Sequence, residues 1–434
     1  MIDSTPVTLR MYRGLSAAAA PLAPLLLRYR LRRGKELAER LPERHGESHI
    51  PRPRGPLVWV HGASVGEFNT VLPLIERIRR QTINVLVTTG TVTAAKNAAE
   101  RLHPQVIHQF VPLDVPHFVE RFLDHWRPDL GLFVESDLWP NMIMETTERG
   151  VPLILVNGRL SERSFRRWRA VPGTIGGLLG RFTLCLVRTP DDAERYGALG
   201  APHLLTTGNL KLDVPPPPAD AGDVETLKAA IGARRVFAAA STHAGEETVV
   251  IEAHRLLRQS FPDLITLLAP RHPDRGAAIA EMVAAAGLRG RMRSRGDSPD
   301  AATDIYIADT LGEMGLLYRI APIVLMGGSL IPHGGQNPIE PAKLSTAIVH
   351  GPHVANFADI YAALDKAHGA AIVTDASKLA LRVGAWLDDE ALRLSVADAA
   401  RKTVDALGGA LERTAAALDP YLMQLRQDYR NANA

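Results

Sequence analysis

The sequence predicts an α/β protein built from two doubly wound, Rossmann-like domains, and three observations support this fold class. From residue 57 onwards, short apolar runs alternate with longer amphipathic stretches, a pattern typical of a parallel sheet covered by helices. Four consecutive prolines at residues 215–218 interrupt the series, which then starts again. The chain has 434 residues, more than one hydrophobic core usually supports.

The apolar runs give the expected strands. Before the prolines they are residues 57–60, 84–89, 106–111, 130–134, 152–157, 183–187 and 203–207. After the prolines they are residues 235–240, 264–270, 304–309, 321–326, 346–351 and 370–375. Helical stretches such as 69–80 lie between most of them, and a helical segment closes the chain after about residue 376.

These patterns divide the chain into four parts. We predict an N-terminal segment at 1–54, a first Rossmann-like domain at 55–214, a proline-rich linker at 215–224 and a second Rossmann-like domain at 225–434. Sheets of this kind bind ligands beyond the carboxyl ends of their strands. We therefore expect the two domains to face a ligand cleft.

Composition is that of an ordinary globular enzyme, with 46% hydrophobic and 22% charged residues. Disorder, collagen and coiled coil are disfavoured. The one cysteine, Cys185, stands in the apolar run "FTLCLV", so no disulfide can form within the chain and a reducing compartment is favoured. We expect Cys185 to be a core residue.

The basic charge of the chain is concentrated at its N-terminus. Residues 1–54 contain eleven Lys or Arg and five Asp or Glu, whereas the whole chain has a net charge of +3. Nucleic-acid binders carry positive charge over a whole binding face, so this distribution argues against nucleic acid as a partner.

The same segment contains the apolar run "LSAAAAPLAPLLL", residues 15–27, followed closely by arginines. The run is shorter than the roughly 20 residues of a spanning helix and contains Pro21 and Pro24. A signal peptide is disfavoured because the charges follow the apolar run. We expect the segment to rest on a membrane surface. The alternative is a helix packed on the body of the protein.

A glycine-rich turn, "HGASVGE", follows the first predicted strand and ends on Glu67. Its glycines allow close approach of a ligand to the backbone, and a carboxylate here can act as a base. The alternative is a first-turn glutamate favoured by the helix dipole.

The second half contains "MGGSLIPHGGQNPIEPA", residues 326–342, in which Glu340 stands at a predicted helix start. A carboxylate there can accept both hydroxyls of a ribose, while glycine turns and helix amides can take a phosphate. Arg271, after the second strand of this half, also suits a phosphate. The alternatives are a capping glutamate and a salt-bridged surface arginine.

Arginines and aromatic residues alternate in "NGRLSERSFRRWR", residues 157–169. This pattern can indicate single-stranded nucleic acid, a phosphorylated lipid at a membrane, or simply a solvated helix face. We assign Arg163, Arg166, Arg167 and Trp168 to an acceptor or membrane contact.

Several motifs occur in a fixed order: "HGASVGE", "ESDLWPNMI", "NGRLSERSFRRW", "TGNLKLD", "STHAGEE", "LAPRHPDR", "DTLGEMGLLY" and "GGSLIPHGGQNPIEPA". Together they closely resemble the Kdo (3-deoxy-D-manno-octulosonic acid) transferases of Gram-negative lipopolysaccharide assembly. The resemblance runs from about Arg33 to the last residues before the tail.

The resemblance implies the GT-B glycosyltransferase fold and transfer of Kdo from CMP-Kdo to the tetra-acylated lipid A precursor. It also implies inversion at the anomeric carbon, no metal or other cofactor, and a place on the cytoplasmic face of the inner membrane. Consistent with this, the sequence contains no Asp-x-Asp metal motif. Rival functions are another GT-B enzyme, either a different sugar-nucleotide transferase or an epimerase, and a non-catalytic nucleotide-binding scaffold.

The resemblance also implies residue roles. Glu67 matches the family's base, while Glu135 and Lys211 match residues that support the transition state. A second carboxylate at Glu135 is reasonable if it raises the pKa of Glu67 or holds a cation such as Lys211; the alternative is a helix cap. The residues matching the CMP pocket are Pro270, Arg271, Gly312, Glu313, Met314, Asn337, Pro338, Ile339 and Glu340.

Overall fold

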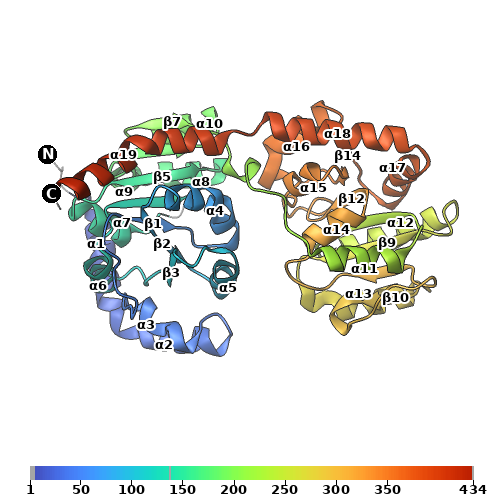
Figure 1. Cartoon of the computed structure of the whole chain (residues 1–434), viewed down its shortest axis with the longest axis horizontal. Helices are drawn as coiled ribbons and strands as arrows, with labels where there is room; N and C mark the ends of the chain where they lie inside the picture. The colour runs from blue at the N-terminus through green and yellow to red at the C-terminus, as the bar shows by residue number, and fades with distance from the viewer. Residues whose placement is uncertain (1–4, 136–137, 433–434) are drawn as a thin grey trace. The chain divides into compact units, whose positions relative to one another are not determined.

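The computed structural model describes residues 5–135 and 138–432, and the chain forms two compact units (Figure 1). Unit 1 comprises Met1–Val214 and Gly408–Ala434, and unit 2 comprises Pro215–Leu407. Each contains one seven-stranded sheet whose assigned strand pairs are all parallel. This confirms the predicted α/β class.

The sheet of unit 1 has the strand order β3-β2-β1-β4-β5-β6-β7. Its strands are β1 (Leu57–His61), β2 (Asn84–Thr89), β3 (Ile107–Phe110), β4 (Leu130–Val134), β5 (Leu153–Gly158), β6 (Leu184–Val187) and β7 (Leu204–Thr206). The chain runs outward from β1 to β3 and then returns to place β4 on the other side of β1. The order therefore reverses between β1 and β4.

Alternate residues of β1 enter different cores, because successive side chains of a strand point to opposite faces. Leu57 and Trp59 belong to one cluster, with residues of α6 (Pro116–Trp126), α7 (Pro140–Glu148) and α9 (Pro172–Leu179). Val58 and Val60 belong to the other, with residues of α4 (Val65–Arg79) and α19 (Ala410–Ala432). All five residues of β1 are buried, as the apolar sequence "LVWVH" requires. Cys185 is buried in the first cluster, as expected.

The last helix, α19, belongs to unit 1, so the prediction that residues 225–434 form one domain is wrong. The carboxylate of Asp213 accepts hydrogen bonds from the backbone N–H groups of Gly409 (2.7 Å) and Leu411 (2.6 Å) at the start of α19. Leu418 and Leu422 then enter the core that contains β1. Figure 1 shows α19, in red, beside the strands of unit 1. Helical periodicity cannot tell to which sheet a closing helix returns.

The sheet of unit 2 has the order β10-β11-β9-β8-β12-β13-β14. Its strands are β8 (Val236–Thr242), β9 (Ile265–Pro270), β10 (Gly290–Met292), β11 (Ile305–Ile307), β12 (Ile323–Met326), β13 (Ala347–His350) and β14 (Ala370–Ile372). The edge strand β10 was not predicted, because "GRM" is short and polar. The order reverses between β8 and β12.

Helices cover this second sheet. They include α12 (Glu246–Arg258), α13 (Gly276–Ala285), α14 (Met314–Ile320), α15 (Ile339–Lys343), α16 (Ala358–Lys366), α17 (Ala376–Asp388) and α18 (Glu390–Ala406). The core that they share with the sheet contains Phe237, Ile279, Leu325, Val383 and Trp386.

The proline segment 215–218 packs on unit 2. The guanidinium of Arg319 donates to the carbonyl of Pro217 at 2.7 Å. A side chain at Gly315, on α14, would collide with the carbonyls of Pro217 and Pro218, so glycine is required there. Helix α11 (Ala221–Ile231) begins inside the predicted linker, with Asp220 as its N-cap. The linker is therefore shorter than 215–224.

The N-terminal segment is helical. Helix α1 (Val7–Ala19) and helix α2 (Ala23–Arg32) flank a short 3₁₀ turn, and α1 buries Leu9 in the unit 1 core. In residues 5–135 and 138–432, no helix is both long enough and apolar enough to cross a bilayer. Within the segment, the buried carboxylate of Glu36 accepts from Arg30 (2.7 Å) and from the buried Arg44 (2.9 Å). The Arg44 guanidinium holds the segment to the sheet, because it donates to the carbonyls of Gly90 (2.7 Å) and Val111 (3.0 Å).

Candidate functional site

Glu67 stands at the start of α4, directly after β1. Its carboxylate accepts from the backbone N–H of Ser64 (3.0 Å), and the Ser64 hydroxyl accepts from the N–H of Glu67 (3.2 Å). This reciprocal pair is a capping box. Glu67 is therefore a first-turn glutamate, as the alternative interpretation of the sequence predicted. The capping box orients its carboxylate at the carboxyl edge of the sheet.

Glu135 follows β4 and forms an ion pair with Lys211, with 2.7 Å between Oε1 and Nζ. Both side chains are largely buried, 17% and 23% exposed. Of the explanations for a second carboxylate, the structure supports the one in which Glu135 holds Lys211. The N–H groups of Asn141 (3.1 Å) and Met142 (2.9 Å) at the start of helix α7 donate to the carboxylate of Asp114, so Glu135 does not cap that helix. Ser136 and Asp137 of the same motif lie outside the described residues.

The backbone of Glu135 is strained, with φ of 61°. A non-glycine residue in the left-handed region costs about 1–3 kcal/mol and persists only where its surroundings impose it. Asn157, at the end of the adjacent strand β5, has φ of 57°. Its Oδ1 accepts from the N–H of Leu210 (3.0 Å) and so holds the short turn that carries Lys211.

Glu67, Glu135 and Lys211 lie at the carboxyl edge of the unit 1 sheet. In parallel α/β sheets, ligands bind beyond the carboxyl ends of the strands where the strand order reverses. Glu67 follows β1 and Glu135 follows β4, the two strands at the reversal in unit 1. The arrangement places carboxylates and one held ammonium group where such sheets carry their chemistry.

The predicted CMP residues follow strands of unit 2. Pro270 ends β9, and the N–H of the exposed Arg271 donates to the carbonyl of Thr242 at the end of β8 (2.9 Å). Asn337 orients the third segment, since its side chain donates to Glu340 (3.2 Å) and accepts from the N–H of Ile339 (3.1 Å). The structure thus places Pro270, Arg271 and residues 337–340 at the carboxyl ends of β9 and β12, on either side of β8.

Glu313, in the second predicted segment, is bound within the protein. Its carboxylate accepts from Arg293 Nε (2.6 Å) and from the Thr310 hydroxyl, and the Arg293 guanidinium holds the pKa of Glu313 below its usual range. Gly312 has φ of 84°. A cavity of about 750 Å³ is lined by Arg293, Thr310 and Glu313 together with Pro273, two residues after Arg271. A ligand in this cavity would meet a Glu313 carboxylate that Arg293 and Thr310 already bind.

We expected the glycine turn that follows β12, "GGSL", to bind a phosphate. For the backbone amides of this turn, the expectation is wrong. Those of Gly328 (2.6 Å), Ser329 (3.0 Å) and Leu330 (2.9 Å) donate to the carboxylate of Glu246, which is fully buried. The N–H of His243 donates to the same carboxylate at 2.9 Å. Glu246 occupies the position that an anion would take. Sequence reasoning missed it, although "STHAGEE" places acidic residues directly after a predicted strand.

The arginine-rich segment forms α8 (Glu162–Arg169) in unit 1. Arg163, Arg166 and Arg167 are exposed, whereas Phe165 and Trp168 are half-buried against the core cluster. Packing against the core explains why aromatic residues occur in this segment, and no stacking on nucleic-acid bases is needed to explain them. The acceptor prediction for this helix therefore rests on its arginines, and Trp168 anchors the helix.

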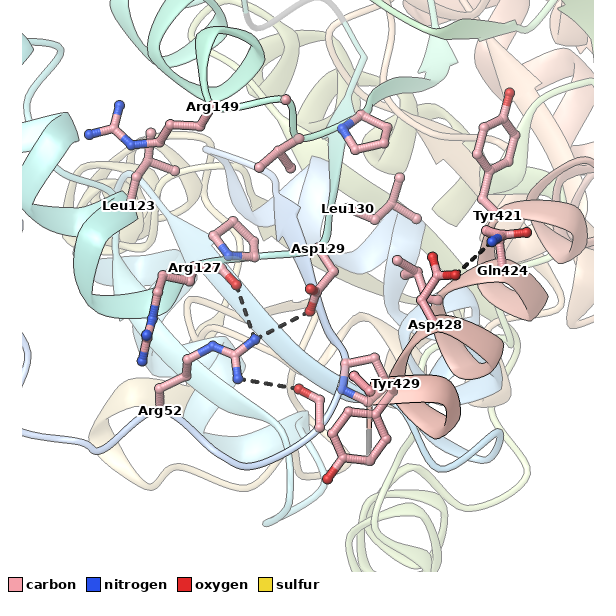
Figure 2. Close-up of a pocket in the computed structure, with 18 of the residues that line it drawn as sticks. Arg52, Leu123, Arg127, Asp129, Leu130, Arg149, Tyr421, Gln424, Asp428 and Tyr429 are labelled. Atoms are coloured by element: carbon pink, nitrogen blue, oxygen red, sulfur yellow. Dashed lines mark hydrogen bonds and ion pairs between the residues drawn. The ribbon is translucent and has the colours of Figure 1, made fainter. Parts of the chain in front are cut away.

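A separate cavity of about 960 Å³ lies at the opposite, amino edge of the unit 1 sheet (Figure 2). Its lining includes Asp129 and Leu130 at the start of β4, and Tyr421 and Tyr429 from α19. Arg52, in the wall of the cavity, donates hydrogen bonds to the carboxylate of Asp129 (3.3 Å) and to the carbonyl of Trp126 (2.7 Å). No predicted site residue lines this cavity, so its size does not make it the candidate site.

Among the residues that the structure describes, no group of three or more His, Cys, Asp or Glu side chains is arranged to hold a metal ion.

Comparison with known proteins relates the chain to one family. Residues 39–214 match the family model described as "3-Deoxy-D-manno-octulosonic-acid transferase (kdotransferase)". A Bordetella pertussis protein named 3-deoxy-D-manno-octulosonic acid transferase is 35% identical, over 95% of this chain and 100% of its own length. The protein of that name from Haemophilus influenzae is 32% identical, over 88% and 92%. An Arabidopsis thaliana protein named "Probable 3-deoxy-D-manno-octulosonic acid transferase, mitochondrial" is 36% identical, over 86% of each chain.

Solved structures support the fold. A UDP-GlcNAc 2-epimerase from Neisseria meningitidis aligns with a TM-score of 0.58 at 11% identity, covering 84% of this chain and 99% of its own. A glycosyltransferase from Rickettsia africae aligns with a TM-score of 0.58 at 11% identity, covering 86% and 99%. At such identities the likeness shows the fold alone, two Rossmann-like domains of the GT-B type.

Proposed function

We propose that the chain, which belongs to the 3-deoxy-D-manno-octulosonic acid (Kdo) transferase family, transfers Kdo from CMP-Kdo to the tetra-acylated lipid A precursor. Membership makes it a glycosyltransferase. The donor, the acceptor, inversion at the anomeric carbon and independence from a metal are the parts that we propose. The observation that carries them is the set of charged groups at the carboxyl edge of unit 1, where Lys211 is held 2.7 Å from Glu135.

In the proposed reaction, an acceptor hydroxyl oxygen attacks the anomeric carbon of Kdo on the side opposite the phosphate. The new C–O bond forms as the bond from that carbon to the phosphate oxygen breaks, and CMP leaves with the electron pair. Attack opposite the leaving group inverts the centre. The hydroxyl proton passes to the Glu67 carboxylate, a step that contributes typically 10²–10⁴-fold to rate. The Lys211 ammonium offsets developing negative charge.

Arg271 and the backbone of the CMP segments support a donor site in unit 2. A CMP leaving group carries one phosphate, which a guanidinium and amide donors can stabilise. We therefore propose that no metal or other cofactor takes part. Glu340, oriented by Asn337, is the proposed acceptor of ribose hydroxyl bonds.

The N-terminal helices support contact with a membrane surface, which we propose is the cytoplasmic face of the inner membrane. Along α1 and α2, large apolar side chains are exposed to solvent: Val7, Met11, Leu15, Leu22, Leu25, Leu26 and Tyr29. Exposed basic residues accompany them, namely Arg10, Arg28, Arg32, Arg33 and Lys35. An apolar face flanked by cations suits an anionic membrane interface, where each cation contributes about 1 kcal/mol. We propose that α1 and α2 form the membrane contact, and that the exposed arginines of α8 contact the acceptor.

Mass spectrometry of the lipid acceptor tests this function. Wild-type protein with freshly generated CMP-Kdo and EDTA should add whole Kdo units to the tetra-acylated precursor. Glu67→Gln should abolish the gain, because glutamine can keep the capping box but cannot take a proton. Glu100→Gln, an exposed glutamate on α5 (Val92–Arg101), is the matched control. An unchanged acceptor with wild type would refute the proposed acceptor or donor, and activity lost in EDTA but restored by a divalent cation would refute metal independence.

A further inference from the structure

Three histidines meet at the carboxyl edge of the unit 2 sheet, and none belongs to the predicted CMP pocket. His243 follows β8, His272 follows β9, and His333 lies in the turn after β12. The rings of His243 and His333 stack with centroids 3.8 Å apart, and those of His243 and His272 are 5.9 Å apart. Because β9, β8 and β12 are neighbours in the sheet, segments far apart in sequence converge on one point.

That point is the strand-order reversal of unit 2. From β8 the chain continues to β9 on one side, and from β12 it continues to β13 on the other. Ligands of doubly wound sheets bind in the crevice at such a reversal. The stacked pair, His243 and His333, follows the two strands that flank it. Ser241, just before His243, has φ of 57°, a strained backbone of the kind that clusters at functional sites.

The local chemistry favours an anion. The backbone amides of residues 328–330 are occupied by Glu246, so side chains must supply the donors. The His243 ring contacts the side-chain amide of Gln336, with 3.0 Å between the two Nε2 atoms. Gly328, whose φ of 65° favours glycine, lies against the same groups: a side-chain carbon there would contact His243, His333 and Gln336 at 3.4 Å.

Electrostatics agrees with this geometry. Burial lowers the pKa of His243, and His333, His272 and Arg271 lower it further. Glu246 opposes them, but its carboxylate is directed into backbone amides. Three of these four neighbouring groups thus disfavour a charged imidazole, and a bound oxyanion would offset their effect.

We propose that His243, His272 and His333, together with Arg271, form a subsite that holds an oxyanion of the sugar-nucleotide donor. The proposal rests on the proposed function, in which the donor carries both a phosphate and a sugar carboxylate. Imidazole N–H groups and a guanidinium can bind either one. The histidines are binding residues for the donor and take no proton from the acceptor.

Binding and kinetics with matched ligands test the subsite and identify its anion. Cytidine has neither anion, CMP has the phosphate, and CMP-Kdo has both. Their binding or KM would be measured for wild type and for His272→Ala and His333→Ala, both of which replace exposed side chains. His368→Asn is the control, since His368 is exposed in the same unit and asparagine tolerates its φ of 56°. Melting temperatures should not differ between these proteins.

We expect a loss of about tenfold, equivalent to about 1.4 kcal/mol, in one of two forms. Weaker CMP binding with unchanged cytidine binding would assign the subsite to the phosphate. Unchanged CMP binding with a raised KM for CMP-Kdo and a retained kcat would assign it to the sugar carboxylate. If the variants match wild type with every ligand while wild type is active, the subsite is overturned and the proposed function stands.

Titration with inorganic phosphate separates the two proposals further. Histidine ring signals in the NMR spectrum of the full chain should shift with phosphate, and His333→Ala should remove one responding signal. A response to phosphate from a wild-type protein that binds no CMP would keep the anion subsite and refute the CMP donor. Silence toward both phosphate and CMP would overturn the subsite and the donor together.

Discussion

The two sheets differ in strand order on one side, yet both reverse beside their first strand, and the two reversals carry different chemistry. In each sheet, the strand order reverses between the first strand and a strand on its other side, β1 and β4 in unit 1 and β8 and β12 in unit 2. The segments after these strands carry Glu67 and Glu135 in unit 1 and His243 and His333 in unit 2. One reversal therefore presents carboxylates and the other presents imidazoles, as expected if one serves a proton-donating acceptor and the other an anionic donor.

A glutamate follows the first strand of both units, and its setting differs. Glu67 is half-buried and bonds the N–H of Ser64, whereas Glu246 is fully buried and accepts four backbone N–H groups. A carboxylate with four amide donors is committed to structure. The Glu67 carboxylate lies in a partly exposed capping box, as the proposed role of a base requires. The same residue type at the same topological position thus has different surroundings in the two units.

After Glu67→Gln, the largest effect should come from Lys211→Met. We expect kcat to fall about 10²–10³-fold, because one preorganised positive group at a developing charge contributes that much. Lys96→Met, an exposed lysine of unit 1, is the control in the same lipid assay. The double variant Glu135→Gln/Lys211→Met tests whether an unpaired Glu135 causes the loss. Recovery of activity in the double variant would show that Lys211 has only a structural role.

The next largest effect should come from Glu246→Gln. This change replaces one of the two carboxylate oxygens that face the amides with an NH2 group, which is a donor and cannot accept. We expect the free energy of unfolding of unit 2 to fall by about 1–3 kcal/mol. Glu67→Gln should leave the unfolding free energy nearly unchanged. Chemical denaturation of both variants checks the difference, with the exposed Glu252→Gln on α12 as control. Equal stability losses at positions 67 and 246 would contradict the contrast drawn between the two glutamates.

Acid should also lower the free energy of unfolding, and both units should contribute. Burial lowers the pKa of His108, in unit 1, to about 3 with a further contribution from Arg40, and it lowers that of His254, in unit 2, to about 4. The unfolded chain takes up these protons near pH 6.5, before the folded one, so stability is complete above that pH and declines as pH falls toward 4.

Denaturation at pH 7, 5 and 4 measures this loss, and replacing each histidine assigns it. His108→Gln should flatten the decline for unit 1, and His254→Gln should flatten it for unit 2. Variants that decline as steeply as wild type would show that other groups control the acid response.

The smallest predicted change is Asp213→Ala, which removes the acceptor for two N–H groups at the start of α19. Loss of such a cap costs about 1 kcal/mol. Hydrogen exchange should show faster opening of α19 with little change in unit 2. Faster exchange in α17 and α18 instead would mean that the closing helix depends on unit 2 for its stability.

Much of the fold follows from local pattern. The apolar runs "LVWV" and "NVLVTT" became β1 and β2, and "HGASVGE" became a turn at the start of a helix, as predicted. The edge strand β10 was missed because its residues carry little apolar signal. The place of α19 was also missed, because its apolar stripe fits either sheet and only Asp213 and the unit 1 core decide between them.

For the site, the resemblance of the motifs identified residues but not their partners. Glu135 and Lys211 are 76 positions apart, and their ion pair depends on the strained turn after β4 and on the support that Asn157 gives to Leu210. The histidine cluster shows the same limit, because His243 and His333 are brought together only by the pairing of β8 with β12.

The sequence by itself determined the fold class, the family and the residue types available to the reaction, because strand and helix periodicities and ordered motifs are local properties of the chain. Only the tertiary structure decided that Glu246 fills the amides of the glycine turn, that α19 returns to unit 1, and that three histidines share one edge. These outcomes depend on contacts between segments distant in sequence, whose energies arise only after the sheets have paired and buried their cores.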